Sequence, residues 1–333
     1  MSLRVENLKV YYCMKRGDCR AVEDISFNIE KGDSVGLVGE SGCGKSTVAF
    51  ALLRMLPFPG QITGGSIYYD GKDLVEYTPE DIRQFRWKKM SMVFQGAMNA
   101  LNPIIKVKDQ IIEAIMQHDL AVSEKEALER VRELFKLVGI DPGRVDHYPF
   151  EFSGGMKQRS MIVMALACNP EFVIADEPTT ALDVTVQAQI MELLQKLTKE
   201  LHITLLLITH DLSVVAETCE KVIIMYAGKI VESGKIVEIF KQPLHPYSQG
   251  LIASIPSIEK SSNQTLASIP GHPPNLLDPP LGCRFHPRCE YAQEICRTDD
   301  PPTEELREGH FVACHLASGK FTNVSYNNVI RGK

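Results

Sequence analysis

Two short stretches of the chain contain the residue types that phosphoryl transfer requires. The first is Gly39-Glu40-Ser41-Gly42-Cys43-Gly44-Lys45-Ser46-Thr47, which matches the pattern G-x-x-x-x-G-K-[ST]. Glycines let successive backbone N–H groups point at phosphate oxygens, and a following helix adds a favourable dipole. We expect Lys45 to reach the β- and γ-phosphates of ATP and Ser46 to bind Mg²⁺. The residues predicted to line this nucleotide site are Gly39, Ser41, Gly42, Cys43, Gly44, Lys45, Ser46 and Thr47.

The second stretch is Phe172-Val173-Ile174-Ala175-Asp176-Glu177, a hydrophobic run that ends in two carboxylates. Phosphoryl transfer needs an acidic group near Mg²⁺ and a group that activates the attacking water. We expect Asp176 to hold Mg²⁺ and Glu177 to accept the proton of that water. Taken alone, an acidic pair after a strand is also ordinary turn chemistry.

The elements around both stretches alternate between strands and helices. Residues 35–38 form an apolar run that stops at glycine, and residues 46–53 continue with helical character. Further buried-strand patterns occupy residues 92–94, 172–175, 204–208 and 221–225, with helical segments between several of them. This order predicts an α/β fold with a mainly parallel sheet covered by helices.

Two segments interrupt that alternation. Residues 107–118 and 123–138 have helical periodicity, and Ser123 with Glu126 forms a capping-box pattern, so we predict a helical subdomain at about 96–160. After residue 240 the composition shifts to proline, serine and short polar runs. We predict a nucleotide-binding domain over 1–240 and an irregular regulatory or metal-binding extension over 241–333 without an evident hydrophobic core.

Bulk composition narrows the class of protein. Hydrophobic residues make up 44% and charged residues 23% of 333, which excludes a largely disordered chain. A formal net charge of -6 argues against general binding of nucleic acid. No apolar run reaches the roughly 20 residues that span a bilayer, and the N-terminus lacks a signal-peptide pattern. We expect a cytoplasmic chain whose cysteines are reduced or bound to metal.

Phe152-Ser153-Gly154-Gly155-Met156-Lys157-Gln158-Arg159 resembles the signature motif of ABC ATPases. The other landmarks of that family follow in order. Gln95 resembles the Q-loop glutamine, Ala181-Leu182-Asp183 resembles the D-loop, and His210 resembles the H-loop histidine. The resemblance implies a P-loop NTPase core of the RecA-like type, with an antiparallel β subdomain beside the inserted helical one.

The resemblance also implies roles for residues outside the phosphate loop. Glu177, His210 and Gln95 would serve catalysis, Gln95 would also approach Mg²⁺, and Asp183 would contribute to the nucleotide site. Tyr12 lies where the family stacks an aromatic ring on adenine, although Tyr11 could serve chemically. Signature residues of this family contact ATP that is bound to a facing subunit, so ATP would hold two such domains together. They correspond here to Ser153, Gly154 and Gly155.

Pro243-Leu244-His245-Pro246-Tyr247 and the cysteine-containing tail resemble the C-terminal extension of dipeptide and oligopeptide importer ATPases. That subfamily implies two transmembrane permease subunits, a second and non-identical ATPase, an extracellular solute-binding protein and a peripheral position at the cytoplasmic face of the membrane. Importers of nickel or other small solutes share the extension. Met156 and residues 96–100 depart from common family forms. A soluble ABC ATPase of DNA repair or translation and a nucleotide-dependent scaffold are the alternatives from other classes.

Four cysteines in the extension, Cys283, Cys289, Cys296 and Cys314, follow the spacing C-x5-C-x6-C-x17-C. A segment with so few apolar residues needs a staple, and disulfides are disfavoured in the cytosol. Zinc usually takes tighter C-x2-4-C pairs. The wide spacing favours a [4Fe-4S] cluster, with zinc or free thiols as alternatives.

Overall fold

The structure is a computed structural model that describes residues 2–96, 100–118, 122–180, 182–255 and 269–320. The chain divides into two compact units. The first consists of Met1–Ile29, Val35–Val75 and Thr209–Lys333, and the second consists of Glu30–Ser34 and Glu76–Ile208.

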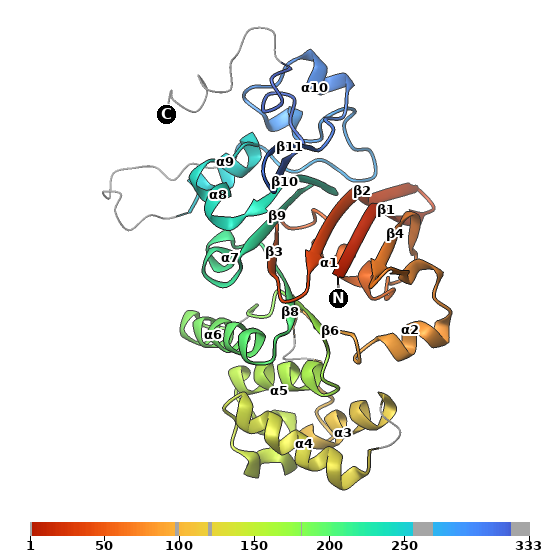
Figure 1. Cartoon of the computed structure of the whole chain (residues 1–333), viewed down its shortest axis with the longest axis vertical. Coiled ribbons are helices and arrows are strands. Elements are labelled where there is room, and N and C mark those ends of the chain that lie inside the picture. The colour runs from red at the N-terminus through yellow and green to blue at the C-terminus, as the bar shows by residue number, and fades with distance from the viewer. Residues whose placement is uncertain (1, 97–99, 119–121, 181, 256–268, 321–333) are drawn as a thin grey trace, which may run out of the picture. The chain divides into compact units, whose positions relative to one another are not determined.

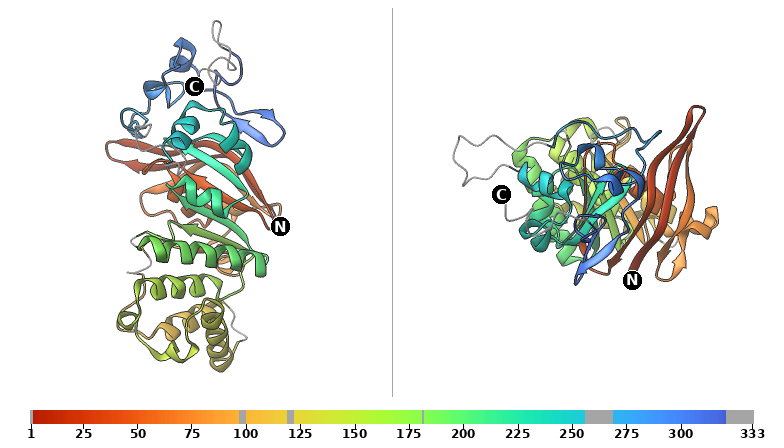
Figure 2. Two further views of the ribbon diagram at one scale, coloured as in Figure 1. Left: turned by 90° about the vertical axis from the view of Figure 1, so that its left-hand side faces the viewer. Right: turned by 90° about the horizontal axis from the view of Figure 1, so that it is seen from above.

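An antiparallel sheet with the strand order β2-β1-β4-β5 lies in the first unit. It consists of β1 (Ser2–Met14), β2 (Gly17–Glu30), β4 (Gly60–Tyr69) and the short β5 (Lys72–Asp73). The burial of β1 alternates along much of its length, as expected for a strand with one covered face. Figure 2 shows β1, β2 and β4 as one curved layer, which confirms the antiparallel β subdomain.

The phosphate-loop strand lies in the second sheet of this unit. Here β3 (Ser34–Val38) pairs in parallel with β9 (Lys221–Tyr226), and β9 pairs with the antiparallel β10 (Lys229–Lys235). Val38 and Ile224 are almost wholly buried, which explains the continuous apolar runs of these strands. Three helices accompany them: α1 (Lys45–Leu52), α7 (Leu212–Thr218) and α8 (Ile236–Lys241).

The C-terminal extension is more regular than the sequence indicated. Its strands β11 (Glu304–Arg307) and β12 (His310–Val312) continue the sheet, because β12 pairs with β10 (Figure 1). It also contains α9 (Pro246–Ala253), a 3-10 turn at His286–Arg288 and α10 (Glu294–Thr298). The expectation of a segment without an apolar core is wrong, since Leu244, Val312, Cys314 and Leu316 form a small buried cluster.

The second unit contains three parallel strands whose carboxyl ends carry polar residues. Its strand β7 (Phe172–Asp176) lies between β6 (Met90–Val93) and β8 (Thr204–Thr209). Every residue of these strands is buried, and the strands predicted at these positions are confirmed.

Helices make up most of the rest of this unit. The predicted helix at 107–118 is α3 (Val107–His118), and the predicted capping box of Ser123 and Glu126 begins α4 (Glu124–Leu137). The remaining helices described in this unit are α2 (Pro79–Phe85), α5 (Gly154–Leu166), α6 (Val184–Glu200) and the short 3-10 turns at Pro142–Asp146 and Pro149–Glu151. A further 3-10 turn at Leu74–Glu76 spans the point in the chain where the first unit ends. Figure 1 shows α3, α4 and α5 as a layered group of helices.

Candidate functional site

The loop between β3 and α1 has the shape of a phosphate cradle. Gly44 precedes α1 with a φ of 105°, a left-handed conformation that favours glycine. A Cβ on Gly39 would lie 2.2 Å from the carbonyl oxygen of Met225, so only glycine fits against β9. The close approach to β9 and the turn into α1 leave the N–H groups at the start of α1 available to an anion.

Lys45 lies inside this loop. Its side chain is buried, and its Nζ donates to the carbonyl oxygens of Gly39 at 2.7 Å and Glu40 at 3.0 Å. When a nucleotide binds, phosphate oxygens can replace one of these carbonyl oxygens as a hydrogen-bond acceptor for the Lys45 ammonium. Ser46 and Thr47 follow in the first turn of α1, where the sequence predicted them.

Two adjacent tyrosines on β1 point to different surroundings. The Tyr12 hydroxyl lies 3.4 Å from the Thr47 hydroxyl at the start of the loop helix. The Tyr11 hydroxyl donates to the Glu23 carboxylate at 2.8 Å, and burial followed by this hydrogen bond raises the pKa of Tyr11 to about 12. Tyr12, and not Tyr11, is therefore the aromatic that lies beside the phosphate loop.

The carboxylates at the end of β7 lie in different environments. Asp176 is the last residue of the strand and is buried. Glu177 has a φ of 43°, an uncommon conformation for glutamate, and its N–H donates to Ile208 at the end of β8. Its Oε2 accepts from Gln95 Nε2 at 2.6 Å and from Thr180 Oγ1 at 3.0 Å. The predicted catalytic residues Gln95 and Glu177 are thus in direct contact.

The signature motif caps a helix. Ser153 is exposed and precedes α5, and its hydroxyl accepts from the N–H of Met156 at 3.4 Å. Gly154 and Gly155 occupy the first turn of α5, so they offer N–H groups to an anion outside the chain.

The D-loop and H-loop residues also lie at the ends of elements. Asp183 caps α6 by accepting from Val186 at 3.0 Å, while Ala181 of the predicted D-loop lies outside the described residues. His210 is exposed directly after β8. Of the departures noted at residues 96–100, positions 97–99 are likewise outside the described part of the chain.

The four cysteines of the extension influence one another electrostatically. Burial raises the pKa of Cys283 and of Cys289 to about 12, and nearby thiols add to both shifts. Burial likewise raises the pKa of Cys314 to about 11, with Cys296 contributing. The N–H of Cys283 donates to the carbonyl oxygen of Cys296 at 2.9 Å. These thiols therefore share one buried region of the extension.

That region does not contain a site for one metal ion. Within the part of the chain that the structure describes, no three His, Cys, Asp or Glu side chains are arranged to hold an ion together. All nine cysteines are free thiols. The four-cysteine metal centre expected from the sequence is therefore not preformed.

Sequence reasoning missed the contacts that the extension makes with the phosphate loop. Arg288 pairs with Glu40, the second residue of the loop, at 2.7 Å, and the N–H of Glu40 donates to the Tyr247 hydroxyl at 3.0 Å. Tyr247 belongs to the motif that marked the subfamily, but nothing local in the sequence indicates that it reaches the loop. A pairing over 248 residues leaves no pattern in a single sequence.

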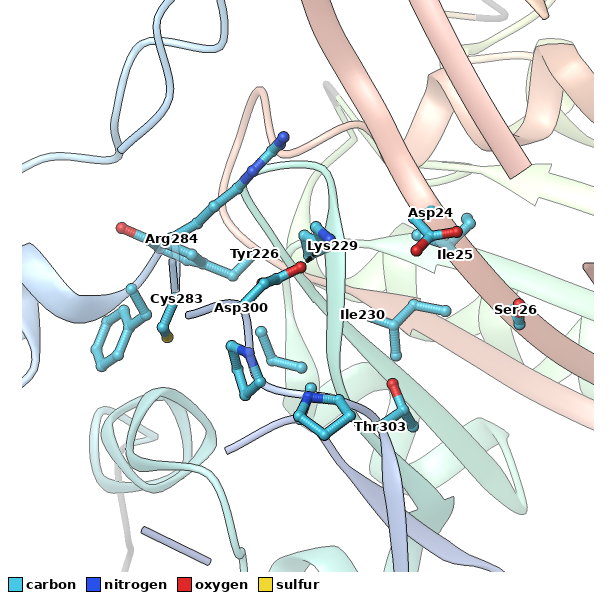
Figure 3. A pocket seen from close by; sticks show the side chains of 15 residues that line it. Asp24, Ile25, Ser26, Tyr226, Lys229, Ile230, Cys283, Arg284, Asp300 and Thr303 are labelled. Carbon is cyan, nitrogen blue, oxygen red and sulfur yellow. Dashed lines mark hydrogen bonds and ion pairs between the residues drawn. The ribbon is translucent and has the colours of Figure 1, made fainter. Parts of the chain in front are cut away.

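A cavity of about 260 Å³ lies beside this extension in the first unit (Figure 3). Its cationic side chains are already paired: Lys229 with Asp300, and Arg284 with Glu23 at 3.4 Å. The cavity therefore presents no unpaired cation to a ligand among the side chains that line it.

Known proteins resemble this chain along nearly all of its length. The family model described as "ABC transporter" matches residues 22–180, and the model "Oligopeptide/dipeptide transporter, C-terminal region" matches residues 231–296. The oligopeptide transport ATP-binding protein OppD of Escherichia coli is 46% identical over 94% of this chain and 92% of its own. The dipeptide transport ATP-binding protein DppD of Caldanaerobacter subterraneus is 44% identical over 94% of this chain and 96% of its own.

Solved structures agree with the fold. The dimeric post-hydrolysis structure of the ATP-binding cassette MJ0796 with ADP and Pi superposes with a TM-score of 0.63 and 30% identity, covering 70% of this chain and 98% of that one. In the part of this chain that is described, no helix combines the length and apolar character needed to cross a membrane. The phosphate loop, the carboxylates after β7, the signature helix and this similarity together show that the chain belongs to the ATP-binding subunits of the oligopeptide and dipeptide ABC transporter family.

Proposed function

We propose that this chain hydrolyses MgATP to power the uptake of dipeptides and oligopeptides. The observation that carries the proposal is the similarity over 94% of the chain to transport ATP-binding proteins named for these substrates. The similarity includes the C-terminal region as well as the ATPase motifs. An importer of nickel or another small solute is the alternative, because the ATPase chemistry is the same for every cargo.

Each predicted group of the ATP site has its own task in the hydrolytic step. The phosphate-loop N–H groups and Lys45 would hold the phosphates, and Ser46 and Asp176 would hold Mg²⁺. Glu177 would take a proton from water as its oxygen attacks the γ-phosphorus, and the bond from that phosphorus to the β-γ bridging oxygen breaks to release ADP. The Gln95 amide at 2.6 Å would keep the Glu177 carboxylate oriented. His210, Tyr12 and Asp183 keep the roles implied by the resemblance.

A second ATPase domain is part of the proposal. Ser153, Gly154 and Gly155 form a helix start that faces outward, which suits contact with the γ-phosphate of ATP on a facing subunit. The related cassette MJ0796 forms a dimer with ADP and Pi, which supports such an arrangement. The other partners would be two permease subunits and an extracellular solute-binding protein. The chain would then lie at the cytoplasmic face of the membrane.

Reconstitution of the whole transporter tests the cargo. The complex is placed in liposomes, and ATP hydrolysis and uptake are measured with labelled dipeptides, with oligopeptides of four to five residues, and with Ni²⁺. Stimulation of hydrolysis and uptake by peptides is the expected result. Stimulation by Ni²⁺ alone would reject peptide import and leave the ATPase assignment intact.

The cysteine region supports a separate proposal, a [4Fe-4S] cluster held by Cys283, Cys289, Cys296 and Cys314. Buried thiols with raised pKa values stay protonated unless a cationic metal group stabilises the thiolates. Tetrahedral zinc, with Zn–S bonds of about 2.3 Å, requires sulfurs only about 4 Å apart. A cluster of four irons binds one thiolate at each iron and holds the thiolates farther apart, and Cys283 is influenced electrostatically by the other three thiols. The cluster would act as a structural staple.

Metal analysis of anaerobically purified protein tests this proposal. Iron and acid-labile sulfide in equal amounts, about four of each per chain, are expected. Both should be lost when Cys296 is changed to serine and retained when Cys219, which lies outside the extension, is changed to serine. Zinc without iron, or no metal at all, would reject the cluster while leaving the transport proposal untouched.

A further inference from the structure

The phosphate loop carries a carboxylate whose partner lies in the C-terminal extension. Glu40 directly follows Gly39, and its side chain is only 26% exposed. Both terminal nitrogens of Arg288 donate hydrogen bonds to this carboxylate, Nη1 to Oε2 at 2.7 Å and Nη2 to Oε1 at 3.0 Å. Paired, parallel hydrogen bonds of this kind fix orientation as well as distance.

Arg288 is itself held rigidly. Its Nε donates to the carbonyl oxygen of Pro270 at 2.7 Å and its Nη2 to that of Ile269 at 3.2 Å. Its Nη1 also lies 3.4 Å from the Tyr226 hydroxyl. The side chain is 5% exposed, so little conformational freedom remains to be lost when it pairs. Arg288 therefore acts as a fixed point for Glu40.

Glu40 links Arg288 to Lys45, the lysine that is expected to bind the phosphates. Its N–H donates to the Tyr247 hydroxyl, its carboxylate accepts from Arg288, and its carbonyl oxygen accepts from Lys45 Nζ at 3.0 Å. The backbone N–H, the carboxylate and the carbonyl oxygen of Glu40 are therefore each held by a different side chain. A shift of Glu40 would therefore move one of the two carbonyl oxygens that position the Lys45 ammonium.

A second arginine of the same segment braces the far end of the loop. Arg284 donates to the carbonyl oxygen of Ala227 and pairs with Glu23 (its place beside Tyr226 is seen in Figure 3). The next residue, Gly228, donates its N–H to the carbonyl oxygen of Cys43 at 2.8 Å. The segment 283–289 thus contacts the loop directly at Glu40 and through the β9–β10 turn at Cys43.

We propose that Arg288 is a positioning residue for ATP binding and that the segment 283–289 of the extension is a brace for the phosphate loop. The loop's affinity for MgATP then depends on a part of the chain that contains none of the ATPase motifs. The inference rests on the ATP site of the family and not on the identity of the cargo or of any metal.

The test compares Arg288→Met with wild type in the full-length chain and in the assembled transporter. Without the brace, fewer loops are in the binding-competent shape, so the Kd and KM for MgATP should rise roughly tenfold. Saturating ATP restores that shape, so kcat should change by less than about twofold. A purely structural defect would instead lower kcat per mole of protein at an unchanged KM. Arg297→Met, an exposed arginine of α10, is the matched control.

A double-mutant cycle separates positioning from simple charge repulsion. Glu40→Gln keeps the shape of the side chain and removes the ion pair, so it should weaken MgATP binding about as much as Arg288→Met. The double variant should be no weaker than either single variant. If an unpaired Glu40 carboxylate merely repelled ATP, Glu40→Gln and the double variant would bind like wild type. That result, or wild-type affinity in Arg288→Met, would overturn the proposal.

Discussion

The strand ends that carry the ATPase motifs and the C-terminal extension are stabilised by different kinds of contact. In β7 and β8 every side chain is buried and most are apolar, so the backbone positions Asp176 and Glu177 with little help from charge. Where β10 meets the extension, buried polar side chains that pair with one another hold the chain in place. Glu232 and His310 are both fully buried and lie 2.7 Å apart, and Glu232 also accepts the N–H groups of Leu244 and His245.

The difference shows how a proline-rich segment can be fixed without a large core. A buried charge costs several kcal/mol unless it is fully paired, so each such group has one acceptable position. Substitutions at the strand ends should therefore change the rate of ATP hydrolysis. Substitutions at the buried pairs should instead lower the free energy of unfolding or, at Arg288, the affinity for MgATP.

The largest effect is expected at the strand ends. Glu177→Gln removes the group that accepts the proton of water, and steady-state ATP hydrolysis by the assembled transporter should fall about 10²- to 10⁴-fold. MgATP binding should persist, because the phosphate loop is unchanged, and the ATP-bound dimer should accumulate. Hydrolysis and dimer formation by size-exclusion chromatography check this. Unchanged turnover would remove Glu177 from catalysis.

A large loss of stability is expected where β10 pairs with the extension. Glu232→Ala leaves His310 and two backbone N–H groups without their acceptor inside the protein. Breaking a buried pair by removing one partner costs about 3–5 kcal/mol. Urea unfolding of the full-length chain measures it, and the midpoint should fall together with the ATP affinity if the brace loosens. A midpoint equal to that of wild type would show that the pair does not hold the extension.

His245 should make this region sensitive to acid. Burial lowers its pKa to about 4 although the Glu232 carboxylate lies nearby. Below about pH 6.5, His245 is protonated in the unfolded chain but stays neutral in the folded chain. The free energy of unfolding therefore falls as the pH drops towards 4, by at most about 3 kcal/mol. His245→Asn keeps an acceptor for the Tyr247 N–H and should flatten the slope between pH 6.5 and 4. The exposed His272, changed to Asn, should leave that slope as it is.

The sequence predicts the strand ends that carry the ATPase motifs better than it predicts the C-terminal extension. The phosphate loop and the order β3, α1, β6, β7, β8, β9 depend on local patterns, and each was predicted at its position. The addition of β11 and β12 to the sheet could not be predicted, since β11 is short and polar and β12 has only three residues, too few to show a period. Arg288 and Glu40 are 248 positions apart in the sequence, so no local pattern predicts their contact.

The smallest effect is expected where the extension has an exposed ion pair. Glu304 and Lys320 lie 3.0 Å apart with side chains 34% and 40% exposed, so water screens their attraction. Glu304→Gln should therefore change the melting temperature by less than about 2 °C, in contrast to Glu232→Ala, which removes the acceptor of the extension's buried His310. Thermal unfolding followed by circular dichroism compares the two variants directly. Equal losses would mean that charge pairing, and not its burial, holds the extension in place.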